Sequence, residues 1–139
     1  MTDAPDVATL YDRLGGEAGV RALVDRFYDH MDTLATAQVI RDMHPADLQS
    51  SRDKLFMFLS GWTGGPQLYW EAHGHPRLRM RHLPYAIDTE AARQWMVCMI
   101  RALDELVEDV SLRESLKLSF VKIAGHMRNT EDPPGSTAG

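Results

Sequence analysis

Residues 73–85 read HGHPRLRMRHLPY, and they decide whether the chain contains a β-strand or is entirely helical. From Arg77 to His82 polar and apolar residues alternate, which taken alone predicts a half-buried strand. The rest of the chain offers no second strand, and a lone strand cannot form a sheet. Leu78 and His82 lie one helical turn apart and can share a helix face, while Pro76 suits a first turn. We therefore predict a short helix that carries His82 near its end.

The segments on either side of this stretch have the periodicity of amphipathic helices, because their apolar residues recur at spacings of three and four. The predicted helices cover about residues 7–14, 17–32, 35–43, 46–62 and 88–107, and a last helix starts near residue 111. Gly15 and Gly16 are expected to stop the first helix, since glycine adopts the left-handed geometry found at helix ends. Asp88 is the predicted N-cap of the long helix, and Ser111 with Glu114 forms a capping-box pattern for the last one. The fold class is all-α.

Each long helix has one predominantly apolar stripe that we expect to be buried. The stripes consist of Val20, Leu23, Val24, Phe27, Tyr28 and Met31; of Leu48, Ser51, Leu55, Phe58, Leu59 and Trp62; of Ala92, Trp95, Met99, Leu103 and Leu106; and of Leu112, Leu116, Phe120, Ile123 and Met127. A phenol at Tyr28 and a hydroxyl at Ser51 interrupt two of the stripes. From the stripes alone, Tyr28 and Trp95 are best interpreted as core aromatics whose polar tips find a partner, and Ser51 is equally compatible with a solvated helix serine.

The composition fits one domain, because 139 residues of which 44% are hydrophobic can bury a core of sufficient size. We predict that residues 8–128 form this domain and that residues 1–7 and 129–139 are disordered tails. The net charge of −5 makes the whole molecule a poor binder of polyanions, so no nucleic-acid partner is expected.

The same composition bears on the compartment. No run of 18 apolar residues is present, and the acidic amino terminus does not resemble a secretory signal, so neither membrane insertion nor export is expected. The single cysteine, Cys98, cannot form an internal disulfide. We therefore expect a cytoplasmic protein.

Common catalytic motifs are absent: there is no glycine-rich phosphate loop, no HExxH and no pair of cysteines. The six histidines are His30, His44, His73, His75, His82 and His126. A zinc site built on His73 and His75 is disfavoured, because ligands two residues apart on a helix project in different directions and no further Cys or His pair completes a tetrahedral set. We expect no metal held by protein ligands alone.

Five elements of the sequence, in this order, are those of a known family. They are LYDRLGG (10–16), RFY (26–28), WTGGP (62–66), GHPRLRMRH (74–82) and Trp95. Together they resemble a truncated haemoglobin of group II over about residues 8–128. The resemblance implies a two-over-two helical sandwich around one b-type haem, with His82 as the proximal iron ligand. Histidine is a common axial ligand where iron must bind a small gas on its other side.

The resemblance also implies a set of haem contacts. On the distal side it places Tyr28, His44, Ser51, Leu55 and Trp95. Phe58, which lies on the same apolar stripe as Leu55, is also predicted to bind the cofactor. A phenol O–H and an indole N–H directed at bound oxygen would donate hydrogen bonds and slow its release. One of Arg77, Arg79 or His75 is expected to hold a haem propionate, because arginine and other cationic groups pair well with carboxylates. Lys54, one helical turn after Ser51, is a further candidate.

His44 departs from the family pattern, since relatives often carry Tyr or Phe at this position. An imidazole can donate or accept a hydrogen bond and titrates near neutral pH. We therefore expect ligand affinity to depend on pH more strongly than in a relative with tyrosine.

Three functions remain open at this point. The first is the binding of O2, CO, NO or other small ligands, for oxygen transport or scavenging. The second is an oxidoreductase, a nitric oxide dioxygenase or peroxidase-like, which would need an external reductase because the chain has no flavin or nicotinamide domain. The third is a haem-free helical module that takes a partner helix in an aromatic groove.

Overall fold

The computed structural model describes residues 9–77, 82, 85 and 87–129, and all regular structure within these ranges is helical. In chain order the elements are α1 (Leu10–Arg13), α2 (Gly16–Thr33), η1 (Ala35–Ala37), α3 (Gln38–Asp42), α4 (Gln49–Trp62), α5 (Leu68–His73), α7 (Thr89–Leu106) and α8 (Val110–Met127). The all-α prediction is confirmed. His82 itself has helical geometry, whereas most of the helix predicted around it lies outside the described residues.

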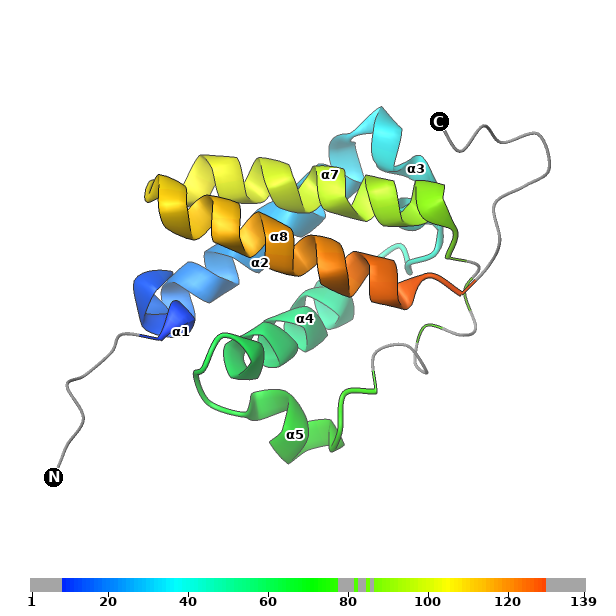
Figure 1. The fold of residues 1–139 in the computed structure, drawn as a ribbon. Coiled ribbons are helices and arrows are strands. Elements are labelled where there is room, and N and C mark those ends of the chain that lie inside the picture. The colour runs from blue at the N-terminus through cyan, green and yellow to red at the C-terminus, as the bar shows by residue number, and fades with distance from the viewer. Residues whose placement is uncertain (1–8, 78–81, 83–84, 86, 130–139) are drawn as a thin grey trace, which may run out of the picture.

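Two pairs of helices form the two layers of the fold (Figure 1). The helices α7 and α8 lie side by side and run antiparallel, and α2 packs against both α7 and α4. The predicted two-over-two sandwich is therefore confirmed. No helix in the described part of the chain combines the length and the hydropathy that a membrane span requires.

The helix α2 forms the centre of the core. All six residues of its predicted stripe are buried, and Val20, Val24 and Phe27 are completely inaccessible to solvent. Ion pairs also join α2 to the neighbouring helix α4. Arg52 of α4 donates to the carboxylates of Asp25 (3.2 Å) and Asp29 (2.9 Å) on α2. These bonds link α2 and α4, the two helices of one layer, on the side of α2 that carries Tyr28.

The helix boundaries differ from the predictions in several places. The N-cap of α8 is Asp109, whose carboxylate accepts from the Leu112 N–H at 3.1 Å, so the predicted cap at Ser111 is wrong. The helix α5 was not predicted. Leu106 is 42% exposed although it was assigned to a buried stripe, because α7 ends at this residue and the chain turns toward α8. The predicted cap at Asp88 is confirmed, since its carboxylate accepts from the Ala91 N–H at 2.9 Å.

Glycines mark the turn between α1 and α2. Gly15 and Gly16 have φ values of 103° and 68°, in the left-handed region predicted for them. At Gly19 the reason is space: a Cβ there would lie 1.7 Å from the carbonyl oxygen of Leu14. A backbone atom cannot move aside as the end of a side chain can, so α1 and α2 approach this closely only with glycine at position 19.

A pair of alanine substitutions tests this packing. We expect Gly19→Ala to lower the free energy of unfolding by about 1–3 kcal/mol, because the clash forces the backbone to shift. Gly125→Ala is the matched control: it lies in α8, and a Cβ there would meet no atom within 4 Å. It should stabilise the protein by up to about 1 kcal/mol through the entropy of the unfolded chain. Urea unfolding measures both, and equal effects of the two substitutions would refute the argument.

Candidate functional site

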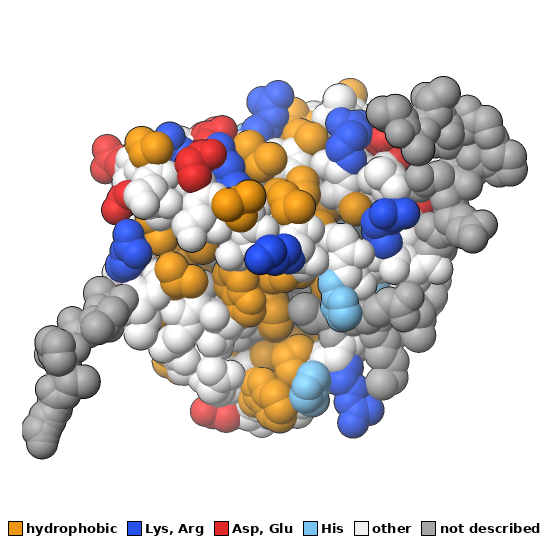
Figure 2. Space-filling model, in the orientation of Figure 1, with side chains coloured by type: hydrophobic (Ala, Val, Ile, Leu, Met, Phe, Trp, Pro, Cys, Tyr) orange, Lys and Arg blue, Asp and Glu red, His pale blue; other side chains and the backbone are white. Residues whose placement is uncertain are grey.

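A cavity of about 510 Å³ lies between α4 on one side and α7 and α8 on the other. Its volume is within the range of about 300–1,000 Å³ that is usual for small-molecule and cofactor sites. Most of its walls are apolar side chains. They are contributed by Ile40, Leu55, Phe58, Ile87, Phe120, Ile123 and Met127, among others. The cavity is thus a predominantly apolar space large enough for a prosthetic group, and hydrophobic side chains gather at the surface between α8 and α4 (Figure 2).

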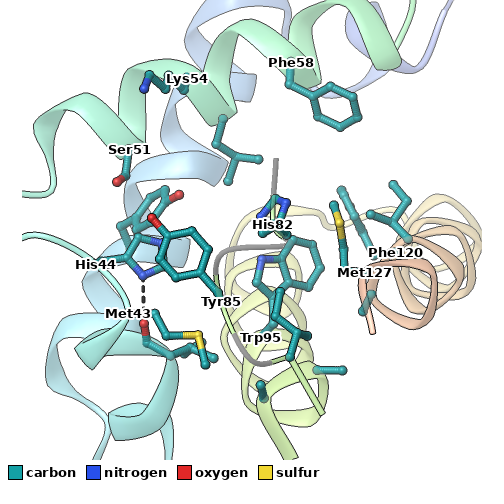
Figure 3. A pocket seen from close by; sticks show the side chains of 18 of the residues that line it. Met43, His44, Ser51, Lys54, Phe58, His82, Tyr85, Trp95, Phe120 and Met127 are labelled. Carbon is teal, nitrogen blue, oxygen red and sulfur yellow. Dashed lines mark hydrogen bonds between the residues drawn. The ribbon is translucent and has the colours of Figure 1, made fainter. Parts of the chain in front are cut away.

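The imidazole of His82 forms part of the wall, and it comes from the segment between α5 and α7 (Figure 3). In the same view Phe58 and Lys54 descend from α4, while Phe120 and Met127 approach from α8. His82 is half-buried. The fold therefore brings the His82 imidazole, a potential metal ligand, to a predominantly apolar cavity.

An aromatic cluster lines the cavity beside α2. The Tyr28 ring packs edge-on against Phe27 at 4.9 Å between centroids, and Phe27 in turn contacts Trp95 at 5.1 Å. Tyr28 also meets the His44 ring at 5.8 Å. Burial raises the pKa of the Tyr28 phenol well above its usual range, so its hydroxyl keeps its proton throughout the physiological pH range. Tyr28 is consequently a permanent hydrogen-bond donor at the edge of the cavity.

The second ring at this edge, His44, has a defined tautomer. Its Nδ1 lies 2.7 Å from the carbonyl oxygen of Ile40. Because a carbonyl only accepts, Nδ1 carries the proton, and in the neutral ring Nε2 is left with a lone pair. Burial is the main cause that lowers the pKa of His44, while the Ile40 carbonyl opposes this effect and the charges of Arg41 and His82 add to it. His44 is therefore neutral at physiological pH and offers an acceptor rather than a donor.

The loop that carries His44 is held from both sides. The Arg41 guanidinium donates to the carbonyl oxygens of Pro45 and Ala46, both at 2.9 Å, and to Asp32 at 2.8 Å. On the other side the buried amide of Gln94 on α7 accepts from the Ile40 N–H at 3.2 Å. The Ile40 carbonyl that orients His44 is thus itself fixed by the core.

One face of α4 completes the cavity. Ser51, Lys54, Leu55 and Phe58 follow one another at helical spacing and all line it. The sequence stripe grouped three of them with core residues such as Leu59, which is 1% exposed. Leu59 also contributes to the cavity wall, but it is almost completely buried in the core, whereas Ser51, Leu55 and Phe58 remain partly accessible.

Comparison with known proteins identifies the family. A profile described as bacterial-like globin matches residues 9–129. The group II 2-on-2 haemoglobin of the plant pathogen Agrobacterium tumefaciens is 43% identical, with a TM-score of 0.88 over 93% of this chain and 99% of that one. The chain is a group II truncated haemoglobin. Haem, iron and small ligands such as oxygen are therefore implied by its family, and the resemblance seen in the sequence is confirmed.

Two further solved structures are similar to this truncated haemoglobin. A cold-adapted truncated haemoglobin from the Antarctic marine bacterium Pseudoalteromonas haloplanktis is 50% identical, with a TM-score of 0.87 over 88% of this chain and 99% of that one. A truncated oxygen-avid haemoglobin from Bacillus subtilis is 37% identical, with a TM-score of 0.80 over 88% of this chain and all of that one.

The cavity of this truncated haemoglobin fits a haem group. A macrocycle needs apolar walls, one axial nitrogen ligand and a cationic group for its propionates. The walls are apolar, His82 supplies an imidazole, and Lys54 supplies a cation on the same cavity. Among the described residues no cluster of three His, Cys, Asp or Glu could hold a metal ion without such a cofactor, and the zinc alternative therefore finds no support in this part of the chain.

The structure brings eight of the ten predicted site residues to one cavity. They are Tyr28, His44, Ser51, Lys54, Leu55, Phe58, His82 and Trp95. His75 is not brought there: it is exposed, its ring lies against Trp70 at 4.8 Å, and its Nδ1 accepts from the Arg77 N–H at 3.0 Å. Arg79 lies outside the described residues. The propionate roles of His75 and Arg79 stay predictions.

Several cavity residues were not among the predicted contacts. Phe120, Ile123 and Met127 belong to the predicted stripe of α8, but they were expected to be ordinary core. Tyr69 comes from α5, and Tyr85 lies in the segment after His82. A stripe that faces a cofactor and one that faces another helix have the same periodicity, so only the tertiary structure distinguishes them.

Proposed function

We propose that this chain binds dioxygen and other small diatomic ligands at a b-type haem, with His82 as the axial ligand and Tyr28 and Trp95 as donors to the bound ligand. The proposal rests mainly on one observation: an imidazole and two aromatic donors line the same apolar cavity. Among the described residues, neither the Tyr28 hydroxyl nor the Trp95 indole N–H has a hydrogen-bond partner within the protein. Donors that line a cavity and have no protein partner there are available to a polar ligand.

The proposed roles of the haem and of the two aromatic donors follow from the chemistry of each group. A bound haem would supply the coordination site and would place partial negative charge on its ligand. The phenol of Tyr28 and the indole of Trp95 can stabilise this negative charge by donating hydrogen bonds to the ligand. Tyr28 remains a donor because burial raises the pKa of its hydroxyl. Slow release of oxygen is the expected consequence. The oxygen-avid relative in Bacillus subtilis is consistent with this expectation.

Lys54 is the first candidate for holding a propionate, because it lines the cavity one helical turn after the distal Ser51. Its ammonium would pair with a carboxylate at the solvent edge, an interaction that contributes little where both groups are exposed. His75 and Arg79 are the further candidates that the family resemblance suggests.

Absorption spectroscopy tests the proposed function directly. The protein purified after expression with haem supplied is expected to show a Soret band in the ferric state and a shift of this band when carbon monoxide is added after reduction. Stopped-flow mixing should then give slow oxygen release. A colourless protein would favour the haem-free helical module, and fast release would argue for oxygen delivery rather than retention.

The tautomer of His44 predicts how oxygen release depends on pH. Above pH 6.5 the ring is neutral and its Nε2 cannot donate, because its pKa is lowered from the ordinary value and Nδ1 is committed to Ile40. As the pH falls below this value the ring gains a second N–H, which adds a donor to the cavity. We expect an oxygen dissociation rate that is constant from pH 7 to 8.5 and decreases in acid.

The control for this prediction is His44→Phe, which keeps an aromatic ring against Tyr28 and removes the titrating group. Stopped-flow measurements from pH 5.5 to 8.5 should give a flat profile for the variant. A wild-type profile that is equally flat, or one that rises in acid, would contradict the assigned role of His44.

A second candidate function is an oxidoreductase that turns over nitric oxide or peroxide. The observation in its favour is His44 itself, since peroxide chemistry needs a base next to the ligand that accepts its proton, and the lone pair on Nε2 can do this. Electrons would come from a separate reductase. Peroxide turnover that disappears in His44→Phe while ligand binding persists would favour this candidate. For either function we propose the cytoplasm, where the buried free thiol of Cys98 stays reduced.

A further inference from the structure

Asn129, which follows the end of α8, is joined to the segment that carries His82. Its backbone N–H donates to the carbonyl oxygen of Ile87 at 2.9 Å, and its side-chain Oδ1 accepts from the N–H of the same residue at 2.9 Å. Its Nδ2 donates to the carbonyl oxygen of His82 at 3.0 Å and to that of Tyr85 at 2.9 Å. One residue thus makes four hydrogen bonds to a stretch more than 40 positions away.

The chemistry of these bonds requires an amide side chain. The NH2 group has two hydrogens and here meets two carbonyl oxygens, while the amide oxygen meets one N–H. An aspartate of the same shape would keep the bond from Ile87, but it would turn an oxygen toward the two carbonyls and lose both donated bonds. Alanine would lose all three side-chain bonds. Asn129 is therefore specific for this arrangement rather than an incidental polar residue of the predicted C-terminal tail.

The bonds hold the backbone on both sides of Tyr85. The carbonyl of His82 accepts from the Tyr85 N–H at 2.9 Å as well as from Asn129. Ile87 is 8% exposed and lies next to Asp88, the N-cap of α7. The backbone of His82 is consequently tied to the place where the beginning of α7 meets the end of α8. Those two helices also line the cavity to which its imidazole contributes.

We propose that Asn129 is a positioning residue for the proximal ligand: by fixing the His82 carbonyl to the end of α8, it sets the orientation of the imidazole toward the haem iron. The inference rests on the proposed role of His82. Asn129 itself is not among the residues that line the cavity. Loss of its bonds should leave the ligand in place while loosening its orientation, as the loss of an outer partner does at other metal sites.

The experiment compares Asn129→Ala and Asn129→Asp with Arg128→Ala, an exposed neighbour that serves as the control. For the haem-loaded ferrous proteins we expect the iron–histidine stretching band in resonance Raman spectra to shift or broaden in both Asn129 variants. Transfer of haem to an excess of apomyoglobin should accelerate by about tenfold. The control should match the wild type in both measurements.

Hydrogen exchange in the apoprotein tests the hydrogen bonds of Asn129 directly, independently of their effect on the iron–histidine bond. In the apoprotein the Ile87 amide hydrogen should exchange faster in Asn129→Ala than in the wild type or in Arg128→Ala, because its acceptor is gone. Should the alanine variant give no folded protein, Asn129→Asp decides, since it keeps the side-chain shape and the acceptor for Ile87. A wild-type iron–histidine band and a wild-type haem transfer rate in Asn129→Asp would overturn the inference.

The same spectra distinguish failure of this inference from failure of the proposed function. If His82→Gly keeps the wild-type iron–histidine band, His82 is not the ligand and both ideas fail. If His82→Gly loses the band while the Asn129 variants keep it unchanged, together with the rate of haem transfer, only the positioning role of Asn129 is refuted.

Discussion

The His82→Gly variant is expected to lose the iron–histidine band and to release haem much faster than the wild type. Removal of a partner that only supports a metal ligand costs about 10- to 100-fold in affinity, so removal of the ligand itself should cost at least as much. The apolar walls contributed by α4, α7 and α8 remain in the variant. We therefore expect residual haem binding, measurable by the rate of transfer to apomyoglobin.

Free imidazole provides the decisive control for this variant. A side chain removed from the cavity leaves space for an exogenous ring, so added imidazole should restore an iron–nitrogen band and slow the loss of haem. His126→Gly is the matched substitution, because His126 is exposed on α8 and does not line the cavity. It should have the wild-type spectrum. Unchanged haem retention in His82→Gly would remove the basis for the proximal assignment.

The second large effect is expected at Tyr28. Tyr28→Phe keeps the ring that packs at 4.9 Å from Phe27 and removes only the hydroxyl. A hydrogen bond to a charged acceptor contributes about 1.5–3 kcal/mol, which corresponds to an increase of about 10- to 150-fold in the oxygen dissociation rate. Stopped-flow displacement of oxygen measures it. The fold should be unaffected, because the apolar contacts of the ring are retained.

Tyr11→Phe is the control for this substitution, since Tyr11 lies in α1 and packs near Gly65, away from the cavity. Its oxygen dissociation rate should equal that of the wild type. Combining Tyr28→Phe with Trp95→Phe in a double-mutant cycle shows whether the two donors act on the same ligand. A wild-type oxygen dissociation rate for Tyr28→Phe alone, with no coupling to Trp95→Phe in the cycle, would exclude the phenol as a donor.

Local signals in the sequence predicted much of the helical framework. The stripe of α2 is buried at every predicted position, and Asp88 caps α7 as its place before an apolar run indicates. These features depend on periodicity and on backbone groups within one turn, which a short window of sequence contains. The predicted cap of α8 is wrong because Asp109 and Ser111 are both suitable capping residues two positions apart, and in the structure the Asp109 carboxylate accepts the hydrogen bond from Leu112.

The contacts made across the fold could not be predicted in the same way. Nothing local indicates that the Ile40 carbonyl fixes the tautomer of His44, since Ile40 is itself held by Gln94 of α7. Likewise Asn129 belonged to a segment read as a polar tail, yet its amide meets carbonyl groups that lie 44 and 47 residues earlier in the chain. Hydrogen bonds between distant segments depend on how whole helices pack, and no short pattern contains that information.

By itself, the sequence determined the helical class, the core face of α2 and, through its ordered motifs, the family. The tertiary structure alone decided which apolar residues of α4, α7 and α8 face the cavity and which face the core, and it alone joined His82 to Asn129. The physical reason is that burial against a helix and burial against a cofactor require the same apolar periodicity. The two become different only when the helices are placed in space.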